Sequence, residues 1–249
     1  MVRRDGHVSA RSTKGPAAHG VLVFVPTYND HTHIPEIEKD VAALGIGARI
    51  LVIDDGSSEP VQTGRDTLIY RAPANVGLGV TTNIALDHAL RGGYRALIRL
   101  DADGQHNSAD IPSLLALIDA GQADLVVGVR SNHMTLRSVS GVVRSIVKTY
   151  FRLASALATA GRAPRDVNTG FFALNREAIR VLGKFEFERF PEPEMFVRAC
   201  RSGLRLAEVL VQQEERTVGR STLRIPDALR MVWRFTVFLI NDMLGSRRS

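Results

Sequence analysis

Two carboxylates separated by one residue stand directly after an apolar segment near the middle of the chain. This segment covers 95–100 and leads into the motif DADGQH (101–106). Alternating carboxylates at the end of a strand bring two hard oxygen donors near one point, which suits Mg²⁺ or Mn²⁺. Asp101 and Asp103 are therefore candidate metal ligands, with the Gln105 side-chain carbonyl as a third. An acidic surface turn is the alternative, but the apolar strand in front favours a metal site.

Three further clusters stand at comparable places. VIDDGS (52–57) ends a second apolar segment, and its Asp54 could accept hydrogen bonds from a base or from ribose hydroxyls. VPTYND (25–30) ends another apolar segment and could place an aromatic ring beside a base. The glycines of NVGLG (75–79) permit the close approach of a ligand or a tight helix entry. The chain has neither a Walker loop nor a dinucleotide fingerprint, which argues against a P-loop NTPase.

Alternating apolar and amphipathic segments must position these clusters. The pattern predicts strands at 21–25, 49–53, 68–70, 95–100 and 124–129, helices at 33–44 and 108–120, and a Gly-rich turn followed by a helix over 75–90. Ser108 is the expected N-cap of the third helix. Strands and helices that alternate at short intervals predict an α/β fold with a doubly wound, mainly parallel sheet. Ligands of such folds bind at the carboxyl ends of the strands, where the acidic clusters fall.

The second half of the chain is less regular. It predicts helices at 136–160, 175–182, 192–202 and 226–243, a strand at 204–211, and a strand or loop at 166–174. The last helix carries one polar stripe, and the rest of its circumference is apolar, so it is amphipathic with a wide apolar face. We expect three parts: a disordered basic tail at 1–20, one domain at 21–225, and this helix with a basic tail at 226–249.

Charge and composition exclude further classes of protein. The 249 residues carry a net charge of +6, but both ends are basic and the middle is mildly acidic. A nucleic-acid-binding domain should be basic across a folded face, so we expect no nucleic-acid partner. The single cysteine, Cys200, excludes an intrachain disulfide. The first twenty residues lack an apolar signal core, and no run of about 18 apolar residues occurs, so we expect a cytoplasmic protein.

Taken together and in this order, the motifs resemble the family 2 glycosyltransferases of the GT-A fold, a Rossmann-like architecture. The resemblance spans about residues 21–224. Besides the four clusters above, it rests on VGVR (127–130), DVNTGFFALNREAI (166–179), PEPEMFVRA (191–199) and ERTVGRSTL (215–223). The DADGQH box is similar to that of the polyprenyl-phosphate sugar synthases, such as the dolichyl-phosphate mannose synthases. Two positions depart from the pattern: Asp30 replaces a usual Glu, and VTTN (80–83) replaces smaller residues.

The resemblance implies an enzyme that moves a hexose from a GDP- or UDP-sugar with inversion at the anomeric carbon and with help from Mg²⁺ or Mn²⁺. It assigns the metal to Asp101, Asp103 and Gln105, and makes Asp103 the critical catalytic carboxylate. Glu192 and Glu194 become candidate general bases for a hydroxyl acceptor. The implied donor-binding residues are Pro26, Tyr28, Asp30, Asp54, Asp101, Ala102, Arg130, Arg216 and Arg220.

The acceptor is open at this point. Polyprenyl phosphate at the cytoplasmic membrane face is favoured by the DADGQH box, the basic ends and the helix at 226–243, which could contact anionic lipid peripherally. The alternatives are a hydroxyl of a cell-wall glycan or small natural product, because PEPEMF also occurs in such enzymes, and a non-catalytic nucleotide-sugar-binding protein. The apolar helix could instead form a homodimer contact or pack on the helix at 136–160.

Overall fold

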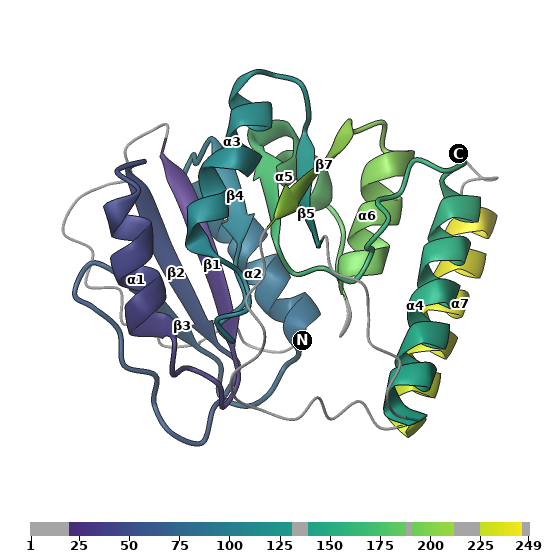
Figure 1. Cartoon of the computed structure of the whole chain (residues 1–249), viewed down its shortest axis with the longest axis horizontal. Helices are drawn as coiled ribbons and strands as arrows, with labels where there is room; N and C mark the ends of the chain where they lie inside the picture. The colour runs from purple at the N-terminus through teal and green to yellow at the C-terminus, as the bar shows by residue number, and fades with distance from the viewer. Residues whose placement is uncertain (1–19, 131–138, 188–190, 212–224, 246–249) are drawn as a thin grey trace, which may run out of the picture.

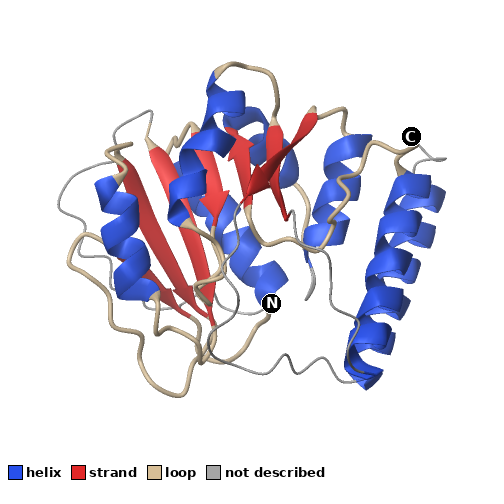
Figure 2. Cartoon of the chain, viewed as in Figure 1, coloured by secondary structure: helices blue, strands red, loops and turns tan. Residues whose placement is uncertain are grey.

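The computed structural model describes residues 20–130, 139–187, 191–211 and 225–245. Within these ranges one seven-stranded sheet runs through the molecule in the order β3-β2-β1-β4-β6-β5-β7, with helices on both faces (Figures 1 and 2). The predicted α/β fold is therefore confirmed. The strands are β1 (Val21–Thr27), β2 (Ala48–Asp54), β3 (Leu68–Arg71), β4 (Ala96–Arg99), β5 (Leu125–Arg130), β6 (Phe172–Asn175) and β7 (Leu206–Val211).

The helices fall close to their predicted ranges. Ser108 does not cap a helix as expected: it opens a short 3₁₀ turn, η1 (Ser108–Asp110), and the Asn107 side chain accepts the hydrogen bond from the backbone N–H of Ala109. The α-helices are α1 (Ile34–Ala43), α2 (Leu78–Arg91), α3 (Ile111–Asp119), α4 (Val139–Ala158), α5 (Arg176–Leu182), α6 (Pro191–Arg201) and α7 (Ile225–Gly245).

The direction of the strands decides where the site forms. Strand β1 is parallel to β2 and β4, and β2 is parallel to β3. Strand β6 is antiparallel to its neighbours β4 and β5, and β7 is parallel to β5. All strands except β6 therefore point the same way, so the loops after β1, β2 and β4, the end of β5 and the segment that enters β6 lie at one edge of the sheet.

The core consists of two layers, one on each face of the sheet. Side chains alternate along β1, so that Leu22 and Phe24 face α2, α5 and α6, whereas Val21, Val23 and Val25 face α1 and α3. All five are fully buried, as expected for a central strand covered on both faces. This packing explains the short, uninterrupted apolar segments in the sequence.

Helices α4 and α7 lie side by side at one end of the molecule (Figure 1). The Phe151 and Phe235 rings meet between them at a tilt of 48° with centroids 5.0 Å apart, and the Tyr150 hydroxyl lies 2.6 Å from Thr236 Oγ1. Asp242 of α7 also pairs with Arg198 of α6. Packing of the last helix on the helix at 136–160, one of the alternatives to membrane contact, is thus present in the structure. In the described ranges, neither these helices nor any other is long and apolar enough to cross a bilayer.

Candidate active site

The loops after β1 and β2 are joined by hydrogen bonds. The backbone N–H of Asn29 donates to Ser57 Oγ at 2.9 Å, and the N–H of Ser58 donates to Asn29 Oδ1 at 2.9 Å. Asn29 takes a left-handed backbone conformation (φ = 54°), which Asn tolerates better than most residues. Tyr28 is half exposed beside this junction, and Pro26 precedes it within β1. The structure therefore brings two of the predicted donor-binding motifs together.

Asp54 and Asp55 differ in what they do for the fold. Asp54 is fully buried; its Oδ1 accepts the backbone N–H of Ser57 at 2.8 Å, and its Oδ2 lies 3.3 Å from Arg71 Nη1. Asp55 accepts the backbone N–H groups of Val76 and Gly77, at 2.7 and 3.0 Å, and so anchors the start of α2. Asp55 thus fixes NVGLG against the same edge, a role that the sequence analysis did not assign.

Arg99 connects the DADGQH motif to α6. It ends β4 with its side chain almost fully buried, and it donates from Nε and Nη2 to Asp101 Oδ1 at 3.1 and 2.8 Å. Its Nη1 donates to Glu192 Oε1 at 2.5 Å. Burial alone would lower the pKa of Arg99, but the two carboxylates outweigh it and raise that pKa above its usual value. One cation therefore holds two carboxylates that come from distant parts of the chain.

The other side of Asp101 is formed by His106 and Gly170. His106 is buried against Phe171, and its Nε2 lies 3.7 Å from Asp101 Oδ2. Gly170 approaches so closely that a Cβ there would lie 2.2 Å from Asp101 Oδ2, so this position requires glycine. Burial works to raise the pKa of Asp101, yet Arg99 and then His106 hold it well below its usual range. Asp101 is a fixed carboxylate anion.

The donors present fit a divalent ion that shares its coordination with a ligand. Asp103 is partly exposed, and its Oδ1 accepts the backbone N–H of Gln105 at 3.1 Å; Ala102 between the carboxylates is buried. Over the described residues, no group of three His, Cys, Asp or Glu side chains could hold a metal by itself. Two carboxylates and an amide carbonyl suit Mg²⁺ or Mn²⁺ only if water or phosphate oxygens complete the shell.

The structure describes some of the remaining predicted site residues and leaves others outside its described ranges. Glu192 is buried against Arg99, and Glu194 is partly buried one turn into α6. Asp30 follows the junction with Asn29. Arg130 ends β5, with its side chain outside the described part, and Arg216 and Arg220 lie wholly outside it. Arg99 is a further site residue that no motif marks, although a charge inside the apolar run ALIRL (96–100) is a readable signal.

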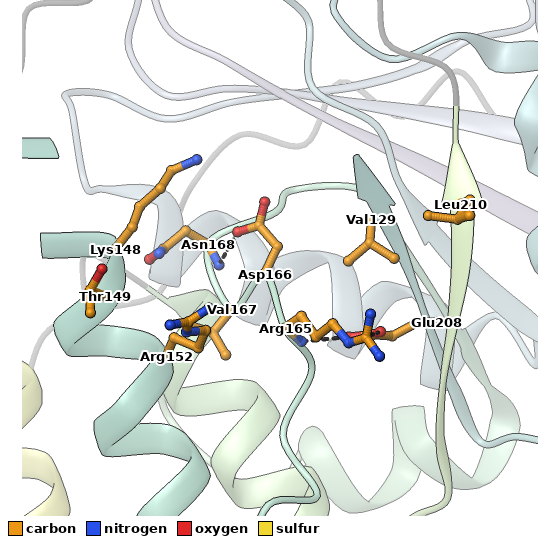
Figure 3. Close-up of a pocket in the computed structure, with 10 residues that line it drawn as sticks. All are labelled: Val129, Lys148, Thr149, Arg152, Arg165, Asp166, Val167, Asn168, Glu208 and Leu210. Carbon is orange, nitrogen blue, oxygen red and sulfur yellow. Dashed lines mark hydrogen bonds and ion pairs between the residues drawn. The ribbon is translucent and has the colours of Figure 1, made fainter. Parts of the chain in front are cut away.

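A pocket of about 460 Å³ opens beside this site, between α4 on one side and β5 and β7 on the other (Figure 3). Asp166 lies on the loop that forms its middle wall. That loop is tied to β5 because the Thr169 hydroxyl donates to the carbonyl of Gly128 at 3.1 Å. The lining residues are Val129, Lys148, Thr149, Arg152, Arg165, Asp166, Val167, Asn168, Glu208 and Leu210.

The sequence model of the family described as Glycosyl transferase family 2 matches residues 22–183. The chain belongs to this family. A polyprenol monophosphomannose synthase from Mycolicibacterium smegmatis is 31% identical over 81% of this chain and 80% of its own. An undecaprenyl-phosphate mannosyltransferase from Micrococcus luteus is 28% identical over 82% and 87%. The resemblance stated from the motifs is therefore confirmed.

Solved structures agree with the fold of this family 2 glycosyltransferase. Glucosyl-3-phosphoglycerate synthase from Mycobacterium tuberculosis, solved with Mn²⁺, UDP and glucosyl-3-phosphoglycerate, aligns with a TM-score of 0.64 at 17% identity, over 91% of this chain and 80% of its own. A mannosyltransferase from Pyrobaculum calidifontis, solved with GDP-mannose and Mn²⁺, aligns with a TM-score of 0.54 at 18% identity, over 84% and 59%. The fold is GT-A.

Proposed function

We propose that this glycosyltransferase transfers a hexose from a nucleoside diphosphate sugar to polyprenyl phosphate in a single displacement that inverts the anomeric carbon. The observation that carries the proposal is the convergence of the β1, β2 and β4 loops on one edge, with Asp101 fixed as an anion by Arg99. The acceptor comes from the names of the two mannosyl-transferring relatives.

The loops after β1 and β2 form the proposed nucleoside end of the donor site. Pro26, Tyr28 and Asp30 line the base and ribose, and Asp54 stabilises the floor beneath them. Asp101, Ala102, Asp103 and Gln105 form the diphosphate end. A divalent ion held by Asp101, Asp103 and Gln105 would stabilise the charge that develops on the departing diphosphate.

Cations complete the proposed diphosphate site. Arg130, at the end of β5, and Arg216 and Arg220 are assigned to the phosphates, since a guanidinium matches phosphate oxygens in a bidentate way. A phosphate acceptor is already anionic and needs no general base. Glu192 is ion-paired with Arg99, so its proposed part is to hold Arg99. Glu194 is the base candidate that a hydroxyl acceptor would require.

The surface of α4 and α7 favours contact with a membrane. Although these helices pack on each other, they leave large apolar side chains exposed: Trp233 by 70%, Leu157 by 87% and Leu153 by 59%. Apolar groups of this size on two adjacent helices can enter the headgroup region of a bilayer, and arginines near them can meet anionic lipid. We infer peripheral binding to the inner face of the cell membrane. A homodimer through the same face is the alternative.

The test of the transfer reaction is a panel of GDP- and UDP-sugars with Mn²⁺ or Mg²⁺, with polyprenyl phosphate, the free polyprenol or no acceptor. We expect release of nucleoside diphosphate and a lipid-linked sugar only with the phosphorylated lipid. A β-linked product from an α-linked donor, identified by NMR, establishes inversion. Transfer to hydroxyl acceptors alone refutes the acceptor, and binding of donor without turnover of any acceptor supports a non-catalytic protein.

The membrane contact has its own test. Trp233→Ser with Leu157→Ser should lower flotation with vesicles that contain anionic phospholipid by severalfold, and should leave turnover of a detergent-dispersed acceptor unchanged. Ile69→Ser with Leu90→Ser removes two exposed apolar residues elsewhere and should not affect flotation. Size-exclusion chromatography separates the alternatives, because a dimer that becomes a monomer in the α4–α7 variant, with unchanged flotation, assigns the face to self-association.

A further inference from the structure

The pocket beside Asp166 carries two cations on one helix. Lys148 and Arg152 stand one turn apart on α4, and both line the pocket together with Thr149 (Figure 3). Residues four apart on a helix project from the same side, so the two cations reach the pocket together. Neither forms an ion pair or hydrogen bond with another residue in the part of the chain that the structure describes.

The opposite wall carries a pair of charges that balance each other. The backbone N–H of Arg165 donates to Glu208 Oε1 at 2.5 Å, and the Arg165 guanidinium lies 3.8 Å from Glu208 Oε2. Asp166 is the carboxylate that remains, and one of its oxygens accepts the backbone N–H of Asn168 at 3.2 Å. Two cations against one carboxylate leave excess positive charge on the α4 side, which favours a small anion.

The position of the pocket connects it to the reaction. The loop that forms its wall runs from Asp166 through Thr169, which is bonded to β5, to Gly170, which touches Asp101. An anion in the pocket therefore lies beside a loop whose other end contacts Asp101 of the DADGQH motif. A loop shared by the pocket and the proposed diphosphate site is what a nucleophile that acts on the donor sugar would require.

Apolar groups continue outward from the same pocket. Leu210 lines it and is 74% exposed, and Leu153, one helical turn after the pocket residue Thr149, is 59% exposed. A ligand with an anionic head and a hydrocarbon tail fits a cationic pocket that is continued by exposed leucines. A hydroxyl acceptor would leave both cations without a partner, and an anionic head would satisfy them.

We propose that this pocket binds the phosphate monoester of the acceptor, and that Lys148 and Arg152 determine specificity for phosphate over hydroxyl acceptors. The assignment rests on the proposed transfer to a lipid phosphate and deepens it. A phosphate monoester carries up to two negative charges near neutral pH, which the two cations match. A lone pair of a phosphate oxygen forms the new bond to the anomeric carbon. At the same time the bond from that carbon to the donor diphosphate breaks, and the nucleoside diphosphate leaves with its electron pair.

The experiment uses full-length protein with Lys148→Gln and Arg152→Gln combined, and farnesyl phosphate, farnesol and glycerol 3-phosphate as probes. Titration calorimetry should show that wild type binds farnesyl phosphate and not farnesol. The double variant should bind it about tenfold or more weakly, because two charge-assisted hydrogen bonds are lost. In turnover the acceptor KM should rise to match, while kcat and the donor KM change less than about twofold.

Lys39→Gln with Arg65→Gln is the matched control, because it removes two positive charges from α1 and the β2–β3 connection, at the opposite end of the sheet from β5 and β7. Unchanged farnesyl phosphate binding in the α4 variant, or an equal loss in the control, overturns the pocket assignment. Glycerol 3-phosphate bound as tightly as farnesyl phosphate would identify a soluble phosphate ester as the ligand. If farnesyl phosphate binds in this pocket but receives no sugar, the pocket assignment is supported and only the proposed acceptor is refuted.

Discussion

The sheet carries an acid–base cluster at each of its two edges, and the clusters are built differently. At the amino ends of β5 and β7, Asp124 accepts from the Asn175 amide at 2.9 Å, from the Arg205 backbone at 2.8 Å, and from the Arg205 guanidinium at 2.8 and 3.0 Å. At the carboxyl end of β4, Asp101 binds Arg99 through Oδ1 only.

The two carboxylates differ in how many of their oxygens the protein already binds. Both oxygens of Asp124 are bound by the protein, and its side chain is 12% exposed. Asp101 keeps Oδ2 at 3.7 Å from His106, which is too long for a hydrogen bond, and its side chain is 30% exposed. A fully satisfied carboxylate stabilises the fold, whereas one that is fixed in position and only partly satisfied is ready for a ligand. This comparison predicts opposite effects of mutation at the two edges.

The largest effect is expected at Arg99. Arg99→Met leaves Asp101 and Glu192 close together without a cation, and removal of one partner of a buried ion pair costs about 3–5 kcal/mol of unfolding free energy. Arg99→Lys keeps the charge, so it should fold, but with weaker binding of Mn²⁺ and nucleoside diphosphate because the two-pronged contact is lost. Urea unfolding and calorimetry measure the two effects.

Arg95→Met serves as the control for Arg99. Arg95 precedes the same strand and pairs with Asp119 on the surface, where both side chains are well exposed. Such a pair contributes about 0–1 kcal/mol. Equal destabilisation in the Arg95 and Arg99 variants, or normal nucleotide binding by Arg99→Lys, would contradict the proposed role of Arg99 in positioning Asp101.

The next largest effect is expected at Asp103, and it should appear in turnover rather than in stability. Asp103→Asn keeps the shape of the side chain and removes its charge, so the transfer rate should fall by about a hundredfold or more. The melting temperature should change little because Asp103 is partly exposed. A well-folded Asp103→Asn protein with near-normal turnover would refute metal-assisted departure of the diphosphate.

Much of this edge could be predicted from sequence because its signals are local. DADGQH and VIDDGS stand directly after apolar strands, and strands that run parallel bring such ends together. The antiparallel β6 could not be predicted in the same way. The sequence of its four residues resembles that of the parallel strands. Its direction is set by its pairing between β4 and β5, neither of which directly precedes or follows it through a tight turn.

Long-range pairs explain what else the sequence left open. The partner of Arg99 on α6 is 93 residues away, and no spacing rule connects the two. Glu192 stood out as a candidate base because a carboxylate near Pro193 matched a motif, and only its ion pair with Arg99 shows that a buried cation holds it. The same holds for Gly170, whose requirement for glycine arises from the Asp101 carboxylate pressed against it.

The smallest effect is expected at the opposite edge. Hydrogen bonds from the Arg205 side chain, opposed in part by burial, lower the pKa of Asp124 to about 2 from its ordinary 3.8. A depressed pKa stabilises the folded state above the unfolded-state pKa, and this contribution is lost as the pH falls through the folded-state value. Asp124→Asn should therefore cost about 1–2 kcal/mol of unfolding free energy at pH 7, without loss of turnover.

The pH dependence tests the physical origin of that effect. The stability difference between wild type and Asp124→Asn, measured by urea unfolding, should stay constant from pH 7 to about pH 5 and shrink toward pH 2 as the carboxylate protonates. Asp119→Asn, which breaks only the exposed pair with Arg95, should change stability by less than about 0.5 kcal/mol at pH 7. A difference at Asp124 that did not vary with pH would mean that packing, rather than charge, holds the amino edge, and the contrast between the two carboxylates would then lose its electrostatic basis.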